Sequence, residues 1–193
     1  MWNGHSVCVI LPTYNEKDSI RQVIADFFAT GVVDEVMVIN NNAAAGTSEE
    51  VAGTGAVEIH EQRQGYGNAI RRGLSESDRD YLIICEPDAT FLASAVFKLL
   101  AYAADFDIVY GSRTSQQLIW QGANMGLFLR WGNWAVAKYM EFLYNATSLT
   151  DVGCTYRLVR RETARALLPY FKVGGSEFGP EMMITSLRAK YSV

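Results

Sequence analysis

Two acidic residues flank a proline in the segment Glu86-Pro87-Asp88, directly after the apolar run Leu82–Cys85. An unbroken apolar run is typical of a buried strand in a parallel sheet, which puts both acids at the carboxyl end of that strand. Ligands bind at this edge of open α/β sheets, and neighbouring carboxylates repel each other unless a cation lies between them. A divalent Mg²⁺ or Mn²⁺ ion, bound by one or two carboxylates and by substrate phosphates, explains such a pair. The alternative is a solvated turn that caps a helix starting near Thr90.

The elements that must position these acids alternate between strand and helix. The expected strands are Val7–Leu11, Val36–Ile39, Val57–Ile59, Leu82–Cys85 and Asp107–Tyr110. Between the first two strands, apolar residues recur at helical spacing until Gly31, a residue type that commonly ends helices. Strand, helix and strand in this order form a right-handed parallel unit. The sequence therefore predicts a single α/β domain over residues 1–193, with a mostly parallel central sheet flanked by helices.

An aromatic-rich segment, Leu127–Tyr144, interrupts the alternation. Its Trp and Tyr residues, combined with Arg and Lys, suit a helix that rests in a lipid headgroup layer or docks a second copy of the chain. An ordinary core helix is the alternative interpretation.

The alternation resumes after this segment. A strand is expected over Asp151–Val159, a helix from about Glu162, and a last helix that Pro180 opens. The final residues, Ala189–Val193, are typical of the start of another strand. They predict a domain that is truncated at its carboxyl end, or a minimal family member.

Composition excludes several classes of function. The formal charge of −4 argues against a nucleic-acid binder. Cys8, Cys85 and Cys154 are odd in number and far apart, so neither a disulfide framework nor a zinc site is indicated. The first residues lack the order of a signal peptide, and the longest apolar stretches are shorter than the roughly 20 residues that span a bilayer. The expected location is cytoplasmic.

With these residues in place, the chain resembles the family 2 glycosyltransferases of GT-A fold over nearly its whole length. Within them it resembles the polyprenyl-phosphate (dolichyl-phosphate) mannosyl- and glucosyltransferase-like branch. The resemblance implies a Rossmann-like nucleotide-diphospho-sugar transferase fold. It also implies an inverting transfer of a sugar from a nucleotide-sugar donor, with Mg²⁺ or Mn²⁺ as the cofactor.

Two segments carry the implied donor pocket. Leu11–Glu16 is similar to the family's opening motif, which implies that Pro12, Tyr14 and Glu16 line the nucleotide site. The stretch that contains Gly67 resembles a glycine-containing family segment, in which backbone approaches the ligand closely. A plain turn at the start of a helix is an equally good interpretation of this glycine.

Asn40 and Asn41 stand where the family usually has an acid that contacts the nucleobase. An amide offers both a donor and an acceptor, whereas a carboxylate only accepts, so the base preference is left open. Glu86 and Asp88 match the family's Asp-x-Asp metal motif. The resemblance implies that Asp88 is the catalytic metal ligand and that Glu86 reaches the metal or a ribose hydroxyl.

The implied acceptor residues lie in the second half of the chain. The Gly-Ser-Arg segment ending at Arg113 resembles a family segment after the corresponding strand, which implies that Arg113 faces phosphate. Asp151–Arg157 looks like the acceptor-side motif that handles a lipid phosphate in this branch. Arg157 would offer the fork geometry that phosphate prefers, and a solvated arginine at a strand end is the alternative.

The identity of the acceptor decides which residues are catalytic. A polyprenyl phosphate is already an anion and needs no protein base, whereas a saccharide hydroxyl requires one. Asp151 and Glu181 are the candidate bases, and Glu181 fits equally well as an acid near a helix amino terminus. A degenerate domain that binds nucleotide or a partner without turnover is a further alternative. A lipid acceptor predicts peripheral contact with the inner face of a membrane.

Overall fold

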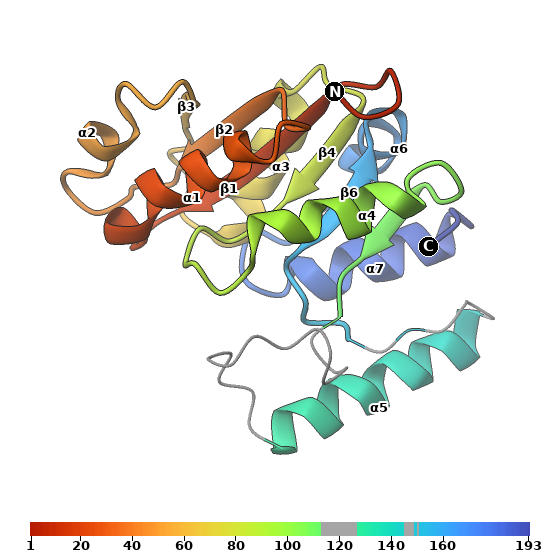
Figure 1. Cartoon of the computed structure of the whole chain (residues 1–193). Helices are drawn as coiled ribbons and strands as arrows, with labels where there is room; N and C mark the ends of the chain where they lie inside the picture. The colour runs from red at the N-terminus through yellow and green to blue at the C-terminus, as the bar shows by residue number, and fades with distance from the viewer. Residues whose placement is uncertain (113–126, 145–148, 150) are drawn as a thin grey trace.

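A central sheet organises the computed structural model, which describes residues 1–112, 127–144, 149 and 151–193. Its strands are β1 (Val7–Thr13), β2 (Glu35–Asn40), β3 (Val57–His60), β4 (Tyr81–Ile84), β5 (Ile108–Tyr110) and β6 (Arg157–Arg160). Within the described residues their order is β3-β2-β1-β4-β6-β5 (Figure 1). The first four are parallel, and β6 runs antiparallel to both β4 and β5. The predicted α/β class with a mostly parallel sheet is confirmed.

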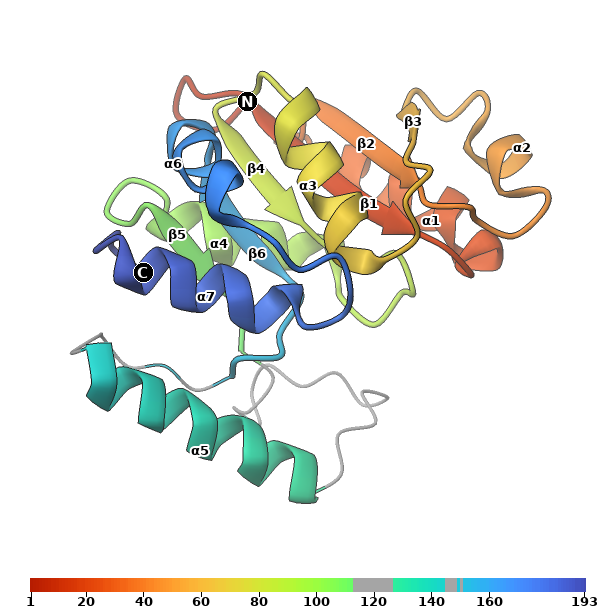
Figure 2. The ribbon, with the colours of Figure 1, turned by 180° about the vertical axis from the view of Figure 1, so that it is seen from behind.

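Helices cover both faces of this sheet. The helices of the described residues are α1 (Lys17–Ala29), α2 (Thr47–Val51), α3 (Tyr66–Glu76), α4 (Val96–Tyr102), α5 (Leu127–Tyr144), α6 (Arg161–Leu167) and α7 (Phe178–Arg188), with 3₁₀ turns at Ala93–Ala95 and Leu168–Tyr170. One core lies between the sheet and helices α1 and α4. A second core lies between the opposite face and helices α3, α6 and α7 (Figure 2).

The central strand β1 is buried on both faces, which explains its unbroken apolar sequence. Val9 and Leu11 belong to the core under α1, whereas Cys8 and Ile10 belong to the core under α3. Burying one such aliphatic side chain stabilises the fold by about 1.5–3 kcal/mol. Burial also raises the pKa of the Cys8 thiol to about 12, so this cysteine is an inert core residue.

The strand expected over Asp151–Val159 is shorter than predicted, because β6 begins only at Arg157. Ahead of it, the side chain of Asp151 accepts the backbone N–H of Gly153 at 2.9 Å, and Arg157 Nε donates to the carbonyl of Cys154 at 2.7 Å. These local hydrogen bonds occupy the Gly153 N–H and the Cys154 carbonyl, which would otherwise pair with a neighbouring strand. The segment before Arg157 is therefore a loop.

The carboxyl-terminal elements also differ slightly from the prediction. The last helix begins at Phe178, and Pro180 lies in its first turn, where a backbone N–H has no helical partner. The expected final strand is wrong, because the residues after α7 form a turn and irregular structure. Ser192 instead exchanges hydrogen bonds with Asp107, the residue before β5.

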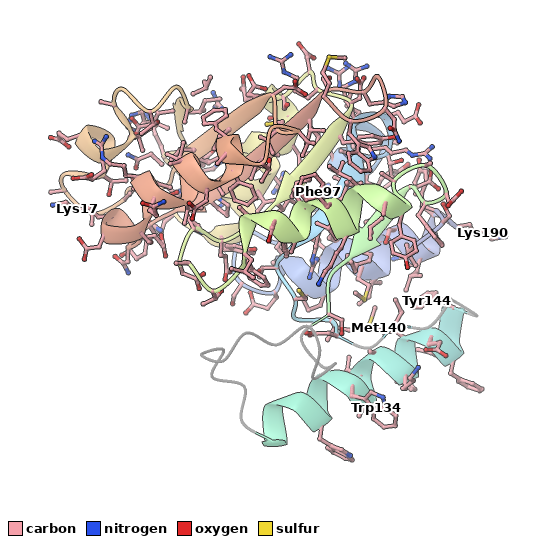
Figure 3. The ribbon with its side chains drawn as sticks, viewed as in Figure 1. Lys17, Phe97, Trp134, Met140, Tyr144 and Lys190 are labelled. Atoms are coloured by element: carbon pink, nitrogen blue, oxygen red, sulfur yellow. The ribbon has the colours of Figure 1, made fainter. Side chains whose placement is uncertain are left out.

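Helix α5 lies outside the two cores and contacts the molecule through α7 (Figure 1). Ala137 and Met140 are buried against Met183 and Leu187 of α7. Figure 3 shows Met140 directed toward the body of the protein and Trp134 directed away from it. Among the described side chains of this helix, the large apolar residues that are exposed include Trp131, Trp134, Val136, Tyr139, Phe142 and Leu143. Among the described residues, no helix has the length and apolar character needed to cross a membrane.

Candidate active site

The carboxyl ends of β1, β2 and β4 meet at one edge of the sheet and bring the predicted donor residues together. The register pairs Thr13 with Asn40, so Tyr14 follows β1 next to the loop that follows β2. On the other side, the Ser19 hydroxyl of α1 donates a hydrogen bond to the carbonyl of Pro87 in the loop after β4. Three segments that are distant in the sequence therefore form one polar edge (Figure 1).

Asp88 is exposed on the loop that follows β4. Its Oδ1 accepts the backbone N–H of Thr90 at 3.0 Å and the Thr90 hydroxyl at 2.7 Å. Ala89 between them has a φ of 61°, the left-handed conformation of a tight turn. The alternative interpretation is correct in predicting a solvated turn here. It is wrong in predicting that the turn caps a helix near Thr90, because the next helical turn starts at Ala93. The turn orients the Asp88 carboxylate and leaves it at the surface.

Glu86 is partly buried two residues before Asp88. Burial, together with the negative charge of Glu86, raises the pKa of the Tyr66 hydroxyl on α3. Among the described residues, no three His, Cys, Asp or Glu side chains gather as a metal site. The loop after β4 contributes two carboxylates, those of Asp88 and Glu86. Such a sparse set fits Mg²⁺ or Mn²⁺ only when substrate phosphates complete the coordination.

The loop after β1 is shaped by Glu16. The Oε2 atom of Glu16 accepts the backbone N–H groups of Tyr14 at 2.7 Å and of Asn15 at 2.9 Å. Pro12 is buried within β1, whereas the Tyr14 side chain is 49% exposed. Tyr14 therefore lies at the surface, and Glu16 holds the loop that carries it.

Asn40 is 7% exposed at the end of β2. Its Nδ2 donates to Glu58 Oε1 at 2.8 Å and to Ser48 Oγ at 3.3 Å, and its Oδ1 accepts the N–H of Ala43 at 2.8 Å. Sequence reasoning missed Glu58 and Ser48. The available signal was Glu58 itself, a charged residue between two apolar residues of β3.

Asn41 is 3% exposed, and its side chain is used inside the fold. Its Nδ2 donates to the carbonyls of Glu61 and Arg63 at 2.8 and 2.9 Å, and its Oδ1 accepts the N–H of Gly65 at 2.7 Å. Asn41 therefore holds the loop that leads into α3. If Asn41 affects nucleotide binding, it would do so indirectly, by holding the loop in place.

Gly67 is explained by packing of the protein on itself. A Cβ atom at this position would lie 2.5 Å from the Val173 carbonyl oxygen and 2.9 Å from Phe178 Cβ. The Gly67 N–H donates to the carbonyl of Gly175 at 3.2 Å, and the Asn68 N–H donates to the carbonyl of Gly174 at 3.1 Å. The close approach inferred from the glycine is real, but the approaching group is the loop before α7. The amino end of α3 thus has protein partners.

Arg157 is 3% exposed, so the solvated alternative is wrong. Its guanidinium donates to the carbonyl oxygens of Cys154 at 2.7 Å, Gly179 at 2.7 Å and Val152 at 3.1 Å. It also lies 5.0 Å from the centre of the Tyr110 ring. The fork predicted for phosphate is engaged with backbone, where it joins the loop before β6 to the start of α7.

The two candidate bases also have protein partners. Asp151 is 3% exposed and accepts the N–H of Gly153. Glu181 on α7 accepts the N–H of Lys172 at Oε1 and the N–H of Val173 at both oxygens. Each carboxylate therefore supports a loop.

The segment after β5 is described only as far as Ser112. The Gly111 N–H donates to the Tyr156 carbonyl at 2.9 Å, which places this segment beside the loop before β6. Arg113 lies outside the described residues. Its predicted contact with phosphate stays a prediction.

Sequence comparisons identify relatives of the chain. The family model Glycosyl transferase family 2 matches residues 8–168. Dolichyl-phosphate hexose transferase of Haloferax volcanii is 32% identical over 160 residues, which are 81% of this chain and 67% of that protein. Glycosyltransferase AglJ of the same organism is 28% identical over 160 residues, 82% of this chain and 51% of AglJ. The chain thus spans about half the length of AglJ.

Solved structures support the fold. Glucosyl-3-phosphoglycerate synthase from Mycobacterium tuberculosis, in complex with Mn²⁺, UDP and glucosyl-3-phosphoglycerate, matches with a TM-score of 0.75 at 17% identity, over 96% of this chain and 66% of that chain. The same enzyme with Mn²⁺, UDP-glucose and phosphoglyceric acid matches with a TM-score of 0.74 at 18% identity, over the same shares of the two chains. The predicted Rossmann-like GT-A fold is confirmed.

Proposed function

Because the chain belongs to glycosyl transferase family 2, we propose that it transfers a hexose, with inversion, from a nucleotide-sugar donor to a polyprenyl phosphate. The donor half of the proposal is supported by the polar edge formed by the ends of β1, β2 and β4. The acceptor half is supported by the relative named Dolichyl-phosphate hexose transferase.

The observation that carries the choice of acceptor is the engagement of both candidate bases. Glu181 accepts the backbone N–H groups of Lys172 and Val173, and taking a proton from an acceptor hydroxyl would weaken these hydrogen bonds. Asp151 is buried at the loop before β6. A phosphate acceptor is an anion at neutral pH and attacks without a protein base. This arrangement therefore favours a phosphate over a saccharide hydroxyl.

The donor diphosphate would lie beside Asp88. Asp88 and Glu86 would bind Mg²⁺ or Mn²⁺ together with the diphosphate, and the ion would stabilise the charge that develops on the leaving nucleotide. The Thr90 hydrogen bonds keep the Asp88 carboxylate oriented before the donor arrives. Tyr14 offers an exposed ring against which a nucleobase can stack. The solved complexes with Mn²⁺ and UDP support this choice of ligands.

Helix α5 would rest on the membrane that contains the lipid acceptor. One side packs on α7 through Ala137 and Met140, and the other side exposes Trp131, Trp134 and Phe142. Phe142 is 84% exposed, which water disfavours and a headgroup layer accepts. In the proposal this contact holds the enzyme at the inner, cytoplasmic face of the membrane.

The proposal is tested with a matched pair of acceptors. Thermal shifts with UDP-, GDP- and dTDP-sugars, each with and without Mn²⁺, first select the donor, because a ligand of the native state raises its stability. The selected donor is then incubated with a polyprenyl phosphate or with the same polyprenol lacking the phosphate. We expect a glycolipid product from the phosphate only.

Two other outcomes would support the alternatives. Transfer to the polyprenol or to a saccharide, at a rate similar to that with the phosphate, would favour an enzyme acting on hydroxyl groups. Donor binding without transfer to any acceptor would favour a degenerate domain.

Membrane contact is tested by sedimentation with anionic liposomes. Replacing Trp131 and Trp134 by Ser should reduce the bound fraction, because two exposed aromatic side chains are lost from the lipid-facing side. Tyr102→Ser, which removes an exposed aromatic residue of α4, is the matched control and should bind as the wild type does. If the double variant sedimented with liposomes as the wild type does, the exposed side of α5 would be better explained as an oligomer interface.

A further inference from the structure

The hydrogen bonds of Asn40 determine which way its amide points. The oxygen and nitrogen of an amide have nearly the same shape, so only their partners assign them. A backbone N–H can only donate, so the atom that faces Ala43 must be the oxygen. An ionised carboxylate can only accept, so the atom that faces Glu58 must be the nitrogen.

Ser48 completes this assignment. The Ser48 hydroxyl donates to Glu58 Oε1 at 2.8 Å, and its oxygen accepts a second hydrogen from Asn40 Nδ2 at 3.3 Å. The amide nitrogen of Asn40 therefore faces acceptors on both β3 and α2. Glu58 Oε1 receives a hydrogen bond from each of the other two residues, so the three side chains form a closed set.

The oxygen of Asn40 retains the capacity to accept a second hydrogen bond. A carbonyl oxygen has two lone pairs, and the Ala43 N–H uses one of them. Asn40 is paired with Thr13, and Ala44 donates its N–H to the Tyr14 carbonyl at 2.8 Å. The Asn40 amide thus lies at the polar edge where the proposed donor base would stack on Tyr14.

We propose that Glu58 and Ser48 are positioning residues that hold Asn40 as a hydrogen-bond acceptor for the donor nucleobase. An acceptor suits a base with a ring N–H, such as uracil, thymine or guanine. Cytosine and adenine have an unprotonated ring nitrogen at the equivalent position. This nitrogen is itself an acceptor, so it would face the Asn40 oxygen without a hydrogen between them. The inference rests on the proposed function, since it assumes a nucleotide donor at this edge.

The base preference is measured with two matched pairs of nucleotides. UDP and CDP, and likewise GDP and ADP, differ at the ring position concerned, and their dissociation constants with Mn²⁺ are compared by calorimetry. We expect the N–H member of the bound pair to bind at least about tenfold more tightly, because the other member leaves buried acceptors unpaired. Equal binding of UDP and CDP would overturn the inference and leave the proposed function intact. Failure of all four nucleotides to bind would overturn both.

A reciprocal exchange tests the roles of Asn40 and Glu58. Asn40→Asp alone places two carboxylates where the wild type has an amide and a carboxylate 2.8 Å apart, so binding of the preferred nucleotide should fall at least about tenfold. Adding Glu58→Gln returns one amide to the pair, with the acceptor still at position 40. The double variant should recover the affinity to within about threefold and keep the N–H preference.

Two observations keep this exchange decisive. Melting temperatures show whether each variant is folded, and Glu49→Gln, an exposed acid on α2, is the control for loss of charge near Glu58. If the folded double variant lost the N–H preference, the amide nitrogen of Asn40 would be the group that reads the base. That result would overturn the inference.

Discussion

The motifs predicted for the donor and the motif predicted for the acceptor lie on neighbouring strands, yet the exposed residues of the first and the buried residues of the second have different partners. On the donor side, Tyr14 is 49% exposed and Asp88 lies on an exposed turn. On the acceptor side, Asp151 and Arg157 are each 3% exposed and are bonded to backbone groups of nearby loops. Both sets match motifs of one family, so a motif match does not by itself separate a ligand contact from a structural contact.

The difference has a physical consequence for substitutions. A change on the acceptor side removes partners from buried carbonyl or N–H groups, so it should act mainly on folding stability. A change at the exposed residues Tyr14 or Asp88 affects a side chain that faces water in the absence of a ligand, so it should act mainly on binding. Four substitutions test this division.

The largest effect is expected for Arg157→Lys. Lysine cannot reach the carbonyls of Cys154, Gly179 and Val152 together, and each buried carbonyl left unpaired costs about 1–3 kcal/mol. The free energy of unfolding in urea should fall by about 3 kcal/mol. Arg165→Lys, at an exposed position of α6, is the control. Unchanged stability with a selective loss of phosphate acceptors would return Arg157 to the predicted acceptor role.

Gly67→Ala tests the contact between the two sides. The added methyl would meet the Val173 carbonyl at 2.5 Å, and the loop before α7 would have to move away from α3. Overpacking of this kind typically costs 1–3 kcal/mol, so we expect a loss of about 2 kcal/mol in unfolding free energy. Gly132→Ala on α5, where a Cβ would meet nothing within 4 Å, should be neutral or stabilising. A loss of donor affinity without a loss of stability would place the ligand at Gly67.

Asp88→Asn should change binding and leave folding unchanged. Asparagine keeps an oxygen that can accept both hydrogen bonds of Thr90, so the turn persists. The affinity for the donor in the presence of Mn²⁺ should fall at least about tenfold, equivalent to about 1.4 kcal/mol. Asp105→Asn, an exposed acid beyond α4, is the calorimetric control. A large drop in melting temperature would show that Asp88 mainly supports the turn.

The smallest effect is expected for Glu181→Gln. The amide oxygen can still accept the Val173 N–H, so the loss of charge should cost less than about 1 kcal/mol of stability. Transfer to a polyprenyl phosphate should continue at a similar rate. If the rate instead fell by two orders of magnitude in a folded variant, Glu181 would be the base of a hydroxyl-transferring enzyme.

The fold was largely predictable, because its signals are local. The apolar runs of β1, β2 and β4 and the helical spacing of Ile20, Val23 and Phe27 identify elements without reference to distant residues. The exceptions are equally informative. The segment before Arg157 is apolar enough for a strand, but hydrogen bonds from Asp151 and Arg157 make it a loop.

The candidate site was predictable in position and less so in the roles of its residues. Parallel strands present their carboxyl ends at one edge, and Tyr14, Asn40 and Asp88 lie at or after the carboxyl ends of β1, β2 and β4, which are parallel neighbours. Glu58 was missed, because its partner Asn40 is 18 residues away on another strand. Residue type alone could not reveal that contact.

The sequence by itself determined the alternation of strands and helices, the family, and the edge of the sheet at which Asp88 is presented. The spacing of apolar residues and the polarity of strand ends are properties of short segments, so they can be recognised from the sequence alone. Only the tertiary structure decided that Arg157 is bonded to the start of α7, that Gly67 packs against a protein loop, and that Asn40 is bonded to Glu58 and Ser48. Those roles depend on hydrogen-bond and packing partners supplied by other elements, and only folding brings these groups within a few ångströms of one another.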